Sequence, residues 1–216
     1  MSASKPETKT EPWTVMSVLR WTTGRFEERG LATPRLDAEI LIATALGVPR
    51  LQLYVQFDRP LTADELAAIR NLVKRRQGGE SVAYIIGRKE FFGLDFAVDA
   101  RVLVPRPDTE SLVDEAIARL RPRPPEPVIV DDAEPAAEAP APVAVTGKVA
   151  DIGTGSGAVI VTLGKRLPDV TLFAVDVSPD ALDVARANAD KHGVAVTFLQ
   201  GDLDAPLRPF APFDLI

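Results

Sequence analysis

The sequence contains no cysteine and a single histidine. These shortages exclude disulfide frameworks, cysteine-ligated zinc, iron–sulfur clusters and thiol nucleophiles, and they argue against a histidine-based metal site or catalytic relay. No run approaches the roughly 20 apolar residues of a membrane helix, and the polar first residues have no apolar core of a signal peptide. We therefore expect no metal, no membrane contact and a cytoplasmic location. Chemistry would then depend on carboxylates, amides, backbone groups or a cofactor.

An excess of positive charge is also missing. The 25 Lys and Arg residues face 31 Asp and Glu, a net charge of −6, which argues against direct binding of nucleic acid through its phosphates. The remaining composition, 46% hydrophobic and 26% charged, is that of a globular protein with one large domain or two small ones.

Three amphipathic helices are predicted in the N-terminal part. The first runs from Val15 to just before Gly30, and the third begins with a capping box, Thr62–Glu65. The second begins at Thr33–Pro34 and ends at Gly47. The expected buried faces are Val15, Val18, Leu19, Thr22 and Phe26; Leu36, Ile40, Ala43 and Leu46; and Leu66, Ile69, Leu72 and Val73. We interpret Lys74, Arg75 and Arg76 as complements of the helix dipole. Trp13, Trp21 and the Phe91–Phe92 pair are interpreted as core or staple residues.

These patterns predict the domain organisation. We expect a flexible tail at 1–14, a helical domain at 15–88 and a β-hairpin connector at 89–104 with its turn near Asp99–Ala100. The rest, 105–216, is expected to be α/β. Its first helix ends near Leu120 and is capped by Asp108 or Thr109. Residues 122–147 hold seven of the 19 prolines and five acids, which predicts a disordered insert.

The most informative segment is the run Asp151-Ile-Gly-Thr-Gly-Ser-Gly157, which has the order strand, glycine-rich turn, helix. Such a turn places backbone N–H groups at the edge of a parallel sheet where small ligands bind. The next predicted strand ends at Asp176, about twenty residues on, where a carboxylate can accept hydrogen bonds from ribose hydroxyls. A helix capped by Ser178, a strand at 194–199 and Asp202 follow. The spacing departs from the dinucleotide pattern G-x-G-x-x-G, and it predicts a nucleotide cofactor held at one edge by Asp151, Asp176 and Asp202.

These residues resemble the class I S-adenosylmethionine-dependent methyltransferases, which have a Rossmann-like α/β fold. Specifically, the chain resembles the glutamine methyltransferases of peptide chain release factors, the PrmC/HemK family. The resemblance extends over most of the chain from Val15, apart from the insert. Besides the glycine loop, it depends on TPRLDAEIL near Ala32–Leu46, RRQGGESVAYIIGRKEFFGLDF at Arg75–Phe96 and LVPRPDTE at Leu103–Glu110.

The resemblance implies S-adenosylmethionine as the cofactor and assigns residues to it. The loop residues would wrap its methionine part with Asp151 orienting the polar groups, while Asp176 would bind the ribose. Asp202 and Leu203 would flank the adenine, and the Pro107–Glu110 segment would lie beside the cofactor. The cofactor-binding residues implied are Asp151, Gly153, Thr154, Gly155, Ser156, Gly157, Asp176, Asp202, Leu203, Thr109 and Glu110.

The resemblance also implies the reaction, methyl transfer to the side-chain nitrogen of the glutamine in the Gly-Gly-Gln motif of release factors, which the helical domain would help to hold. In the family an Asn-Pro-Pro-Tyr segment follows the fourth strand and positions the glutamine. This sequence reaches Pro212–Ile216, the expected start of that strand, and contains no such segment. We therefore expect a C-terminally truncated monomer with an incomplete sheet, no catalytic residue of its own and no methyl transfer by these 216 residues alone.

Three alternatives stay open at this point. A sister family methylates a glutamine of a ribosomal protein, but it has Pro-Arg-Ser-Pro where this chain has Pro105-Arg-Pro-Asp108. An adenine-N6 methyltransferase fits the acidic charge poorly. The third is a non-catalytic module that binds the cofactor or a partner.

Overall fold

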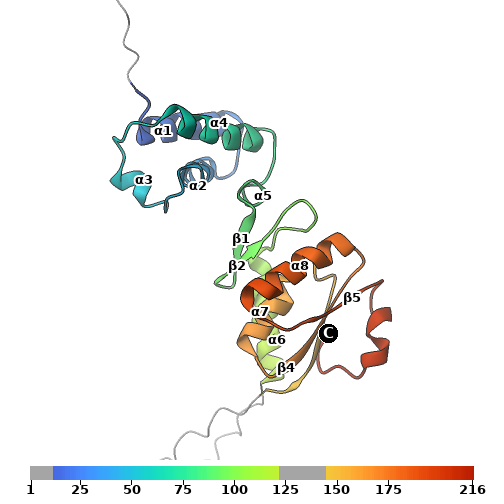
Figure 1. Cartoon of the computed structure of the whole chain (residues 1–216). Helices are drawn as coiled ribbons and strands as arrows, with labels where there is room; N and C mark the ends of the chain where they lie inside the picture. The colour runs from blue at the N-terminus through green and yellow to red at the C-terminus, as the bar shows by residue number, and fades with distance from the viewer. Residues whose placement is uncertain (1–11, 122–144) are drawn as a thin grey trace, which may run out of the picture. The chain divides into compact units, whose positions relative to one another are not determined.

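The computed structural model describes residues 12–121 and 145–216, and it separates the chain into two compact units, residues 1–86 and 87–216 (Figure 1). The expected tail up to residue 11 and residues 122–144 of the expected insert lie outside the described residues. None of the described helices is long and apolar enough to cross a membrane.

The first unit consists of helices. It contains α1 (Val15–Glu28), α2 (Pro34–Leu46), α3 (Gln52–Val55), α4 (Ala63–Gln77) and α5 (Val82–Ile86), and α2 contacts α1 and α4. The three predicted helices are confirmed as α1, α2 and α4, and so is the capping box of α4, in which Glu65 N–H donates to Thr62 Oγ1 at 3.2 Å. Helices α3 and α5 were not predicted, because four or five residues are too few to show a period.

The buried faces were predicted unequally well. All five residues of the α1 stripe are buried. The face predicted for α2 is only partly correct: Ala43 is buried, but Leu36 is exposed and the unpredicted Leu41 and Ile42 are buried. The cause is that Asp37 and Glu39, which a hydrophobic pattern places in solvent, are buried as partners of arginines. Burying these two carboxylates turns the core face of α2 away from Leu36.

Two further interpretations of the helical unit are corrected. Arg75 and Arg76 are more than dipole complements, because they form ion pairs with Glu80 and with the buried Asp37. Trp13 and Trp21 are not core residues, since they remain 44% and 47% exposed.

The second unit begins with a hairpin of β1 (Arg88–Phe91) and β2 (Leu94–Ala97). Its turn is at Phe92–Gly93, where both residues have positive φ (53° and 76°), so the hairpin does not turn near Asp99–Ala100 as predicted. A two-residue turn of this kind matches the twist of the strands it joins, and glycine accepts it without strain. Asp99 begins a separate turn after β2, in which the Val102 N–H donates to the Asp99 carbonyl at 3.1 Å. Phe91, packed edge-on against Phe96, is a core residue as predicted.

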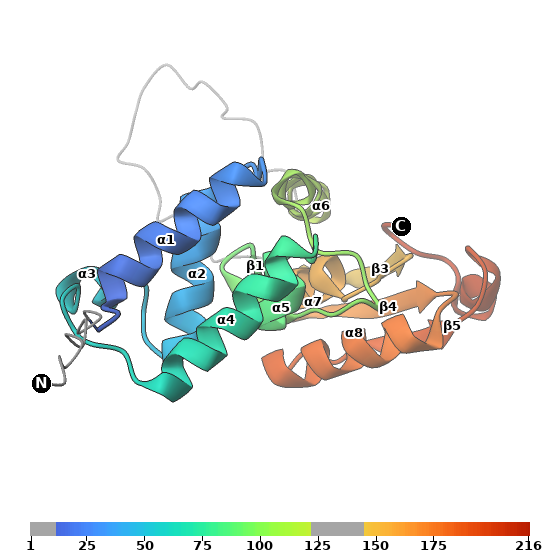
Figure 2. The same cartoon turned by 90° about the horizontal axis from the view of Figure 1, so that it is seen from above.

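A parallel sheet forms the centre of this unit. Its strands are β3 (Gly147–Ile152), β4 (Val170–Asp176) and β5 (Thr197–Gln200), side by side in that order. They are connected by α7 (Ala158–Arg166) and α8 (Pro179–His192), and α8 runs along the sheet (Figure 2). The unit also contains a short 3₁₀ helix η1 (Pro107–Thr109), the helix α6 (Glu110–Leu120) and a second 3₁₀ helix η2 (Ala205–Phe210).

The two faces of the sheet have separate cores. Val149 and Leu172 face the core built with α6 and α7, while Ala150 and Phe173 face a smaller core with Leu207 of η2. The last residues return to the sheet: Leu215 forms a parallel bridge with Val149 on the β3 edge opposite β4. The expected start of a further strand therefore does pair with β3.

Candidate functional site

The glycine loop between β3 and α7 requires glycine at three positions. Gly153, Gly155 and Gly157 have φ of 76°, 54° and 77°, in the left-handed region that other residues rarely adopt. At Gly157 a Cβ would also come within 3.2 Å of Ala185 Cβ, so glycine allows α7 and α8 to approach each other. At Gly153 a Cβ would meet no atom within 4 Å, so this part of the loop leaves its backbone uncovered.

Strand β4 holds this loop in place. The backbone N–H groups of Gly153 and Thr154 both donate to the Val175 carbonyl, at 2.8 and 3.0 Å. Gly155 N–H donates to Asp176 Oδ2 at 2.9 Å, and Ser178 N–H donates to Asp176 Oδ1 at 3.0 Å. Each carboxylate oxygen of Asp176 is therefore fixed by one backbone donor and keeps acceptor capacity for a second.

Asp151 lies next to this arrangement. Its Oδ2 accepts a hydrogen bond of 2.8 Å from the Thr154 hydroxyl. Burial raises the pKa of the Asp151 carboxyl, the negative charge of Asp176 raises it further, and the Thr154 hydrogen bond opposes both. A cationic ligand group at this position would relieve the electrostatic cost of ionising Asp151.

The third acidic residue is at the same edge of the sheet. Asp176 pairs with Gln200 in the β4–β5 register, and Asp202 follows β5 by two residues. Asp202 and Leu203 are both exposed, and Leu203 has a positive φ of 47°. Asp151, Asp176 and Asp202 therefore lie at or just after the carboxyl ends of three parallel strands, as predicted, and their role in binding stays a prediction.

The segment before α6 is arranged differently from the loop. Pro107, Asp108 and Thr109 form η1, and Thr109 makes no side-chain cap for α6. Glu110 Oε1 accepts a hydrogen bond of 2.9 Å from the backbone N–H of Phe92, so its carboxylate holds the hairpin turn. The cofactor role of Thr109 and Glu110 stays a prediction.

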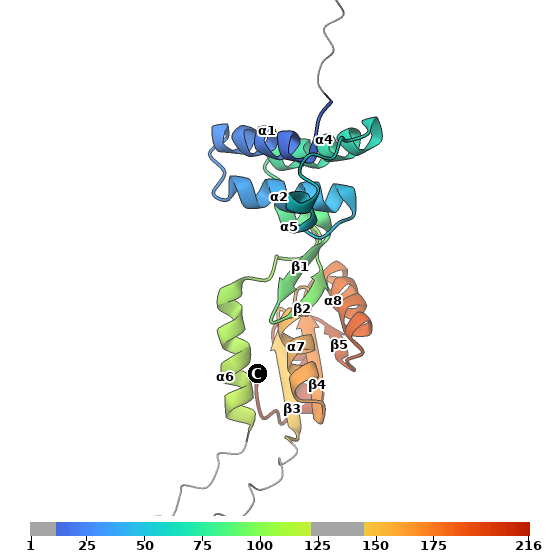
Figure 3. The same ribbon diagram turned by 90° about the vertical axis from the view of Figure 1, so that its left-hand side faces the viewer.

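Sequence reasoning missed Asn188 of α8, whose side chain is fully buried. Its Oδ1 accepts from Ala97 N–H at 2.8 Å, and its Nδ2 donates to the carbonyls of Ala97 and Ser156 at 3.0 and 2.9 Å. Asn188 thereby connects the glycine loop to β2, which α8 contacts (Figure 3). The signal was present in the sequence, because Asn188 continues the apolar stripe of Leu182 and Ala185, where an amide is unusual.

Comparisons with known proteins match both units. The model of the PrmC N-terminal domain matches residues 17–87, and a model described as a methyltransferase domain matches residues 149–216. Among curated proteins, a release factor glutamine methyltransferase of Geobacter sulfurreducens is 44% identical over 96% of this chain and 65% of its own length. Its counterparts in Rhodopirellula baltica and Chlorobaculum tepidum are 44% and 42% identical over 95% and 98% of this chain.

The chain does not span the whole of these relatives. It covers 64% of the Rhodopirellula protein and 67% of the Chlorobaculum protein. The match therefore includes both units of this structure and about two thirds of each relative.

Proposed function

The chain belongs to the release factor glutamine methyltransferase family, and from this premise we propose that the protein transfers a methyl group from S-adenosylmethionine to the glutamine of the Gly-Gly-Gln motif in peptide chain release factors. The observation that supports the cofactor half of this proposal is the hydrogen bond from Gly155 N–H to Asp176, which joins the glycine loop to the acid at the end of β4. Because of this bond, the backbone of the glycine loop and the Asp176 carboxylate are held close enough to bind the same ligand.

The residues present fit this cofactor. Asp176 keeps one acceptor position on each oxygen, which suits the two hydroxyls of a ribose. Asp151 has its pKa raised by burial, and the positively charged methionine part of the cofactor would favour its ionised form. In this proposal Leu203 offers an exposed apolar side chain to the adenine, next to Asp202.

The bound cofactor supplies an electrophilic methyl group on a sulfonium. An amide nitrogen is a poor nucleophile, so alignment of the glutamine with that methyl accounts for much of the rate enhancement we expect. The sequence contains no Asn-Pro-Pro-Tyr segment, and we assign no residue of it to polarising the glutamine. We propose that the helical unit helps to hold the release factor and that Thr109 and Glu110 lie beside the cofactor. We also propose that the protein acts as a monomer in the cytoplasm, where release factors work.

Replacing Asp176 by alanine tests the cofactor site. A hydrogen bond to a charged group contributes about 1.5–3 kcal/mol, so losing even one should weaken S-adenosylmethionine binding by roughly tenfold or more. Isothermal titration calorimetry measures this affinity. The matched control is Asp169→Ala, which removes an exposed carboxylate just before the opposite end of β4 and should leave the affinity unchanged. An unaltered affinity in Asp176→Ala would place the ribose elsewhere.

Methyl transfer is tested on the natural protein as the cell makes it. Incubation with S-adenosylmethionine and a release factor should add the mass of one methyl group to the peptide that contains Gly-Gly-Gln, as tandem mass spectrometry can localise. Methylation at a different residue, or cofactor binding without methylation of any release factor, would refute the proposed substrate.

A further inference from the structure

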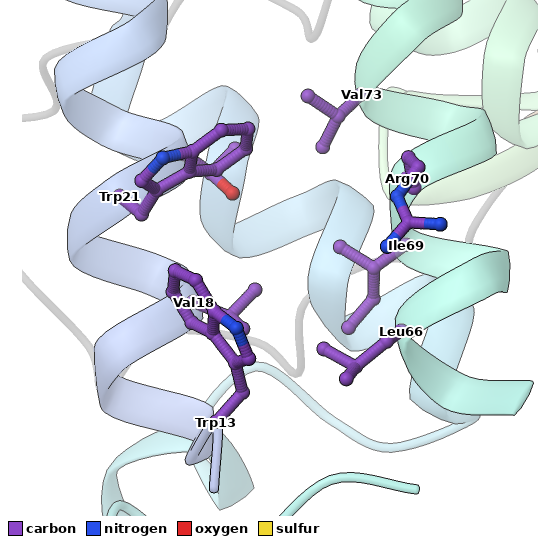
Figure 4. Close-up of a pocket in the computed structure, with 8 residues that line it drawn as sticks. Trp13, Val18, Trp21, Leu66, Ile69, Arg70 and Val73 are labelled. Carbon is purple, nitrogen blue, oxygen red and sulfur yellow. The ribbon is translucent and has the colours of Figure 1, made fainter. Parts of the chain in front are cut away.

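The helical unit contains a pocket between α1 and α4 that the proposed cofactor chemistry does not use. Its volume is about 220 Å³. Figure 4 shows the two indole rings on the α1 side, opposite Ile69, Arg70 and Val73 of α4. The residues that line the pocket are Trp13, Val18, Trp21, Thr22, Leu66, Ile69, Arg70 and Val73.

The two tryptophans are the only ones in the sequence, and both line this pocket. They meet edge to face with ring centroids 6.2 Å apart, yet 44% of Trp13 and 47% of Trp21 is exposed. Tryptophan side chains are rigid and large, so they bind a partner at a small entropic cost and are enriched at the centres of protein interfaces. Two half-exposed indoles beside an apolar pocket therefore indicate a binding surface rather than an incomplete core.

Two polar groups of the pocket have no partner within the described part of the chain. Arg70 is exposed and makes no ion pair or hydrogen bond there, in contrast to Arg75 and Arg76 on the same helix. The Thr22 hydroxyl is fully buried and has no hydrogen-bond partner. A buried unsatisfied hydroxyl is unfavourable in the free protein, and a cation without a counter-ion favours a negatively charged occupant.

The size of the pocket limits the kind of group that can occupy it. Pockets for small organic ligands are usually about 300–1,000 Å³, and this one is smaller, so it suits one bulky side chain rather than a whole cofactor.

We propose that this pocket is a docking site for a segment of a partner protein that carries a bulky apolar side chain next to a carboxylate. The apolar side chain packs between the indoles and Leu66, Ile69 and Val73 of α4, and the carboxylate pairs with Arg70. The site lies wholly within the helical unit, so its test is independent of the proposed methyl transfer.

The test uses two blocked dipeptides as probes, acetyl-Phe-Asp-amide and its neutral analogue acetyl-Phe-Asn-amide. Because the chain has only two indole N–H groups, their nuclear magnetic resonance signals report directly on the pocket. Trp13→Phe and Trp21→Phe assign the two signals. Both signals should shift saturably with the acidic dipeptide, and its affinity should exceed that of the neutral analogue about two- to fivefold, the range of an exposed ion pair.

The preference should disappear in Arg70→Gln, return in Arg70→Lys and persist in Arg20→Gln, which removes the same charge from an exposed α1 position outside the pocket. The proposal is overturned if neither dipeptide shifts the indole signals at millimolar concentration, or if both bind equally well. It is also overturned if the signals shift with protein concentration alone, because a second copy of the chain would then occupy the pocket.

Discussion

The two units of this protein hold their buried and half-buried carboxyl and amide side chains in opposite ways. In the helical unit, buried carboxylates pair with arginines: Asp37 with Arg76, which is 39 residues away in the sequence, and Glu39 with Arg35 and Arg50. In the α/β unit, Asp176 and Asn188 bind backbone groups instead. The first arrangement uses the carboxylate for packing helices together, whereas the second fixes the acid and leaves part of its acceptor capacity to a ligand.

Because of this difference, substitutions should affect the two units differently. An ion pair between α2 and α4 is lost entirely when either partner is removed, and the remaining charge stays buried. A side chain that binds the backbone of a loop can be removed with a smaller cost in stability, but the loop then loses its position. Variants of the helical unit should therefore change stability more than ligand binding, and variants around the glycine loop should do the reverse.

The largest effect is expected for Arg76→Ala. Asp37 has a side chain only 6% exposed, and without Arg76 its charge loses its only ion-pair partner among the described residues. Removing one member of a buried pair costs about 3–5 kcal/mol of unfolding free energy. Urea unfolding followed by tryptophan fluorescence measures it, since both tryptophans lie in the helical unit.

Replacing both partners together provides the control for this pair. Asp37→Leu combined with Arg76→Met removes both charges and keeps apolar volume, and it should recover most of the lost stability. A loss below about 1 kcal/mol in Arg76→Ala would show that the pair is solvated like an exposed one. S-adenosylmethionine affinity should stay unchanged in both variants.

Asn188→Ala should lose less stability than Arg76→Ala, but it should change ligand binding more. It leaves the Ala97 N–H and the Ser156 carbonyl without their partner, at a cost of about 1–3 kcal/mol of unfolding free energy. Because Ser156 belongs to the glycine loop, S-adenosylmethionine affinity should fall as well. Val184→Ala, a buried position on the same helix, is the control: it should lower stability without lowering affinity. Equal affinities of the two variants would make Asn188 a packing residue only.

The same contrast explains what could be predicted from the sequence. The glycine loop, the Thr62–Glu65 capping box and the acids at the strand ends depend on signals within a few residues, and they were predicted correctly. The side chains of Thr33 and Thr109, predicted as caps of α2 and α6, make no cap hydrogen bond. The buried face of α2 depends on Arg50 and Arg76, which come from other elements, so its pattern was misleading. The hairpin turn was misplaced because Phe92 gives no local sign of its positive φ.

The smallest effect, and the finest test of the contrast, is the pH dependence of Asp151→Asn. Burial raises the pKa of the Asp151 carboxyl in the folded protein above its ordinary 3.8. At a pH between 3.8 and this raised pKa, the folded protein therefore binds more protons than the unfolded chain. The contribution of Asp151 to stability is therefore present below pH 3.8 and is lost as the pH rises through the raised pKa. Asparagine has no such titration and still accepts the Thr154 hydrogen bond. Unfolding free energies measured across this range should show Asp151→Asn gaining stability relative to the wild type as the pH rises. If the unfolding free energies of Asp151→Asn and the wild type changed with pH in parallel, the Asp151 carboxyl would be solvated. The α/β unit would then not differ from an exposed surface in the environment that it gives this acid.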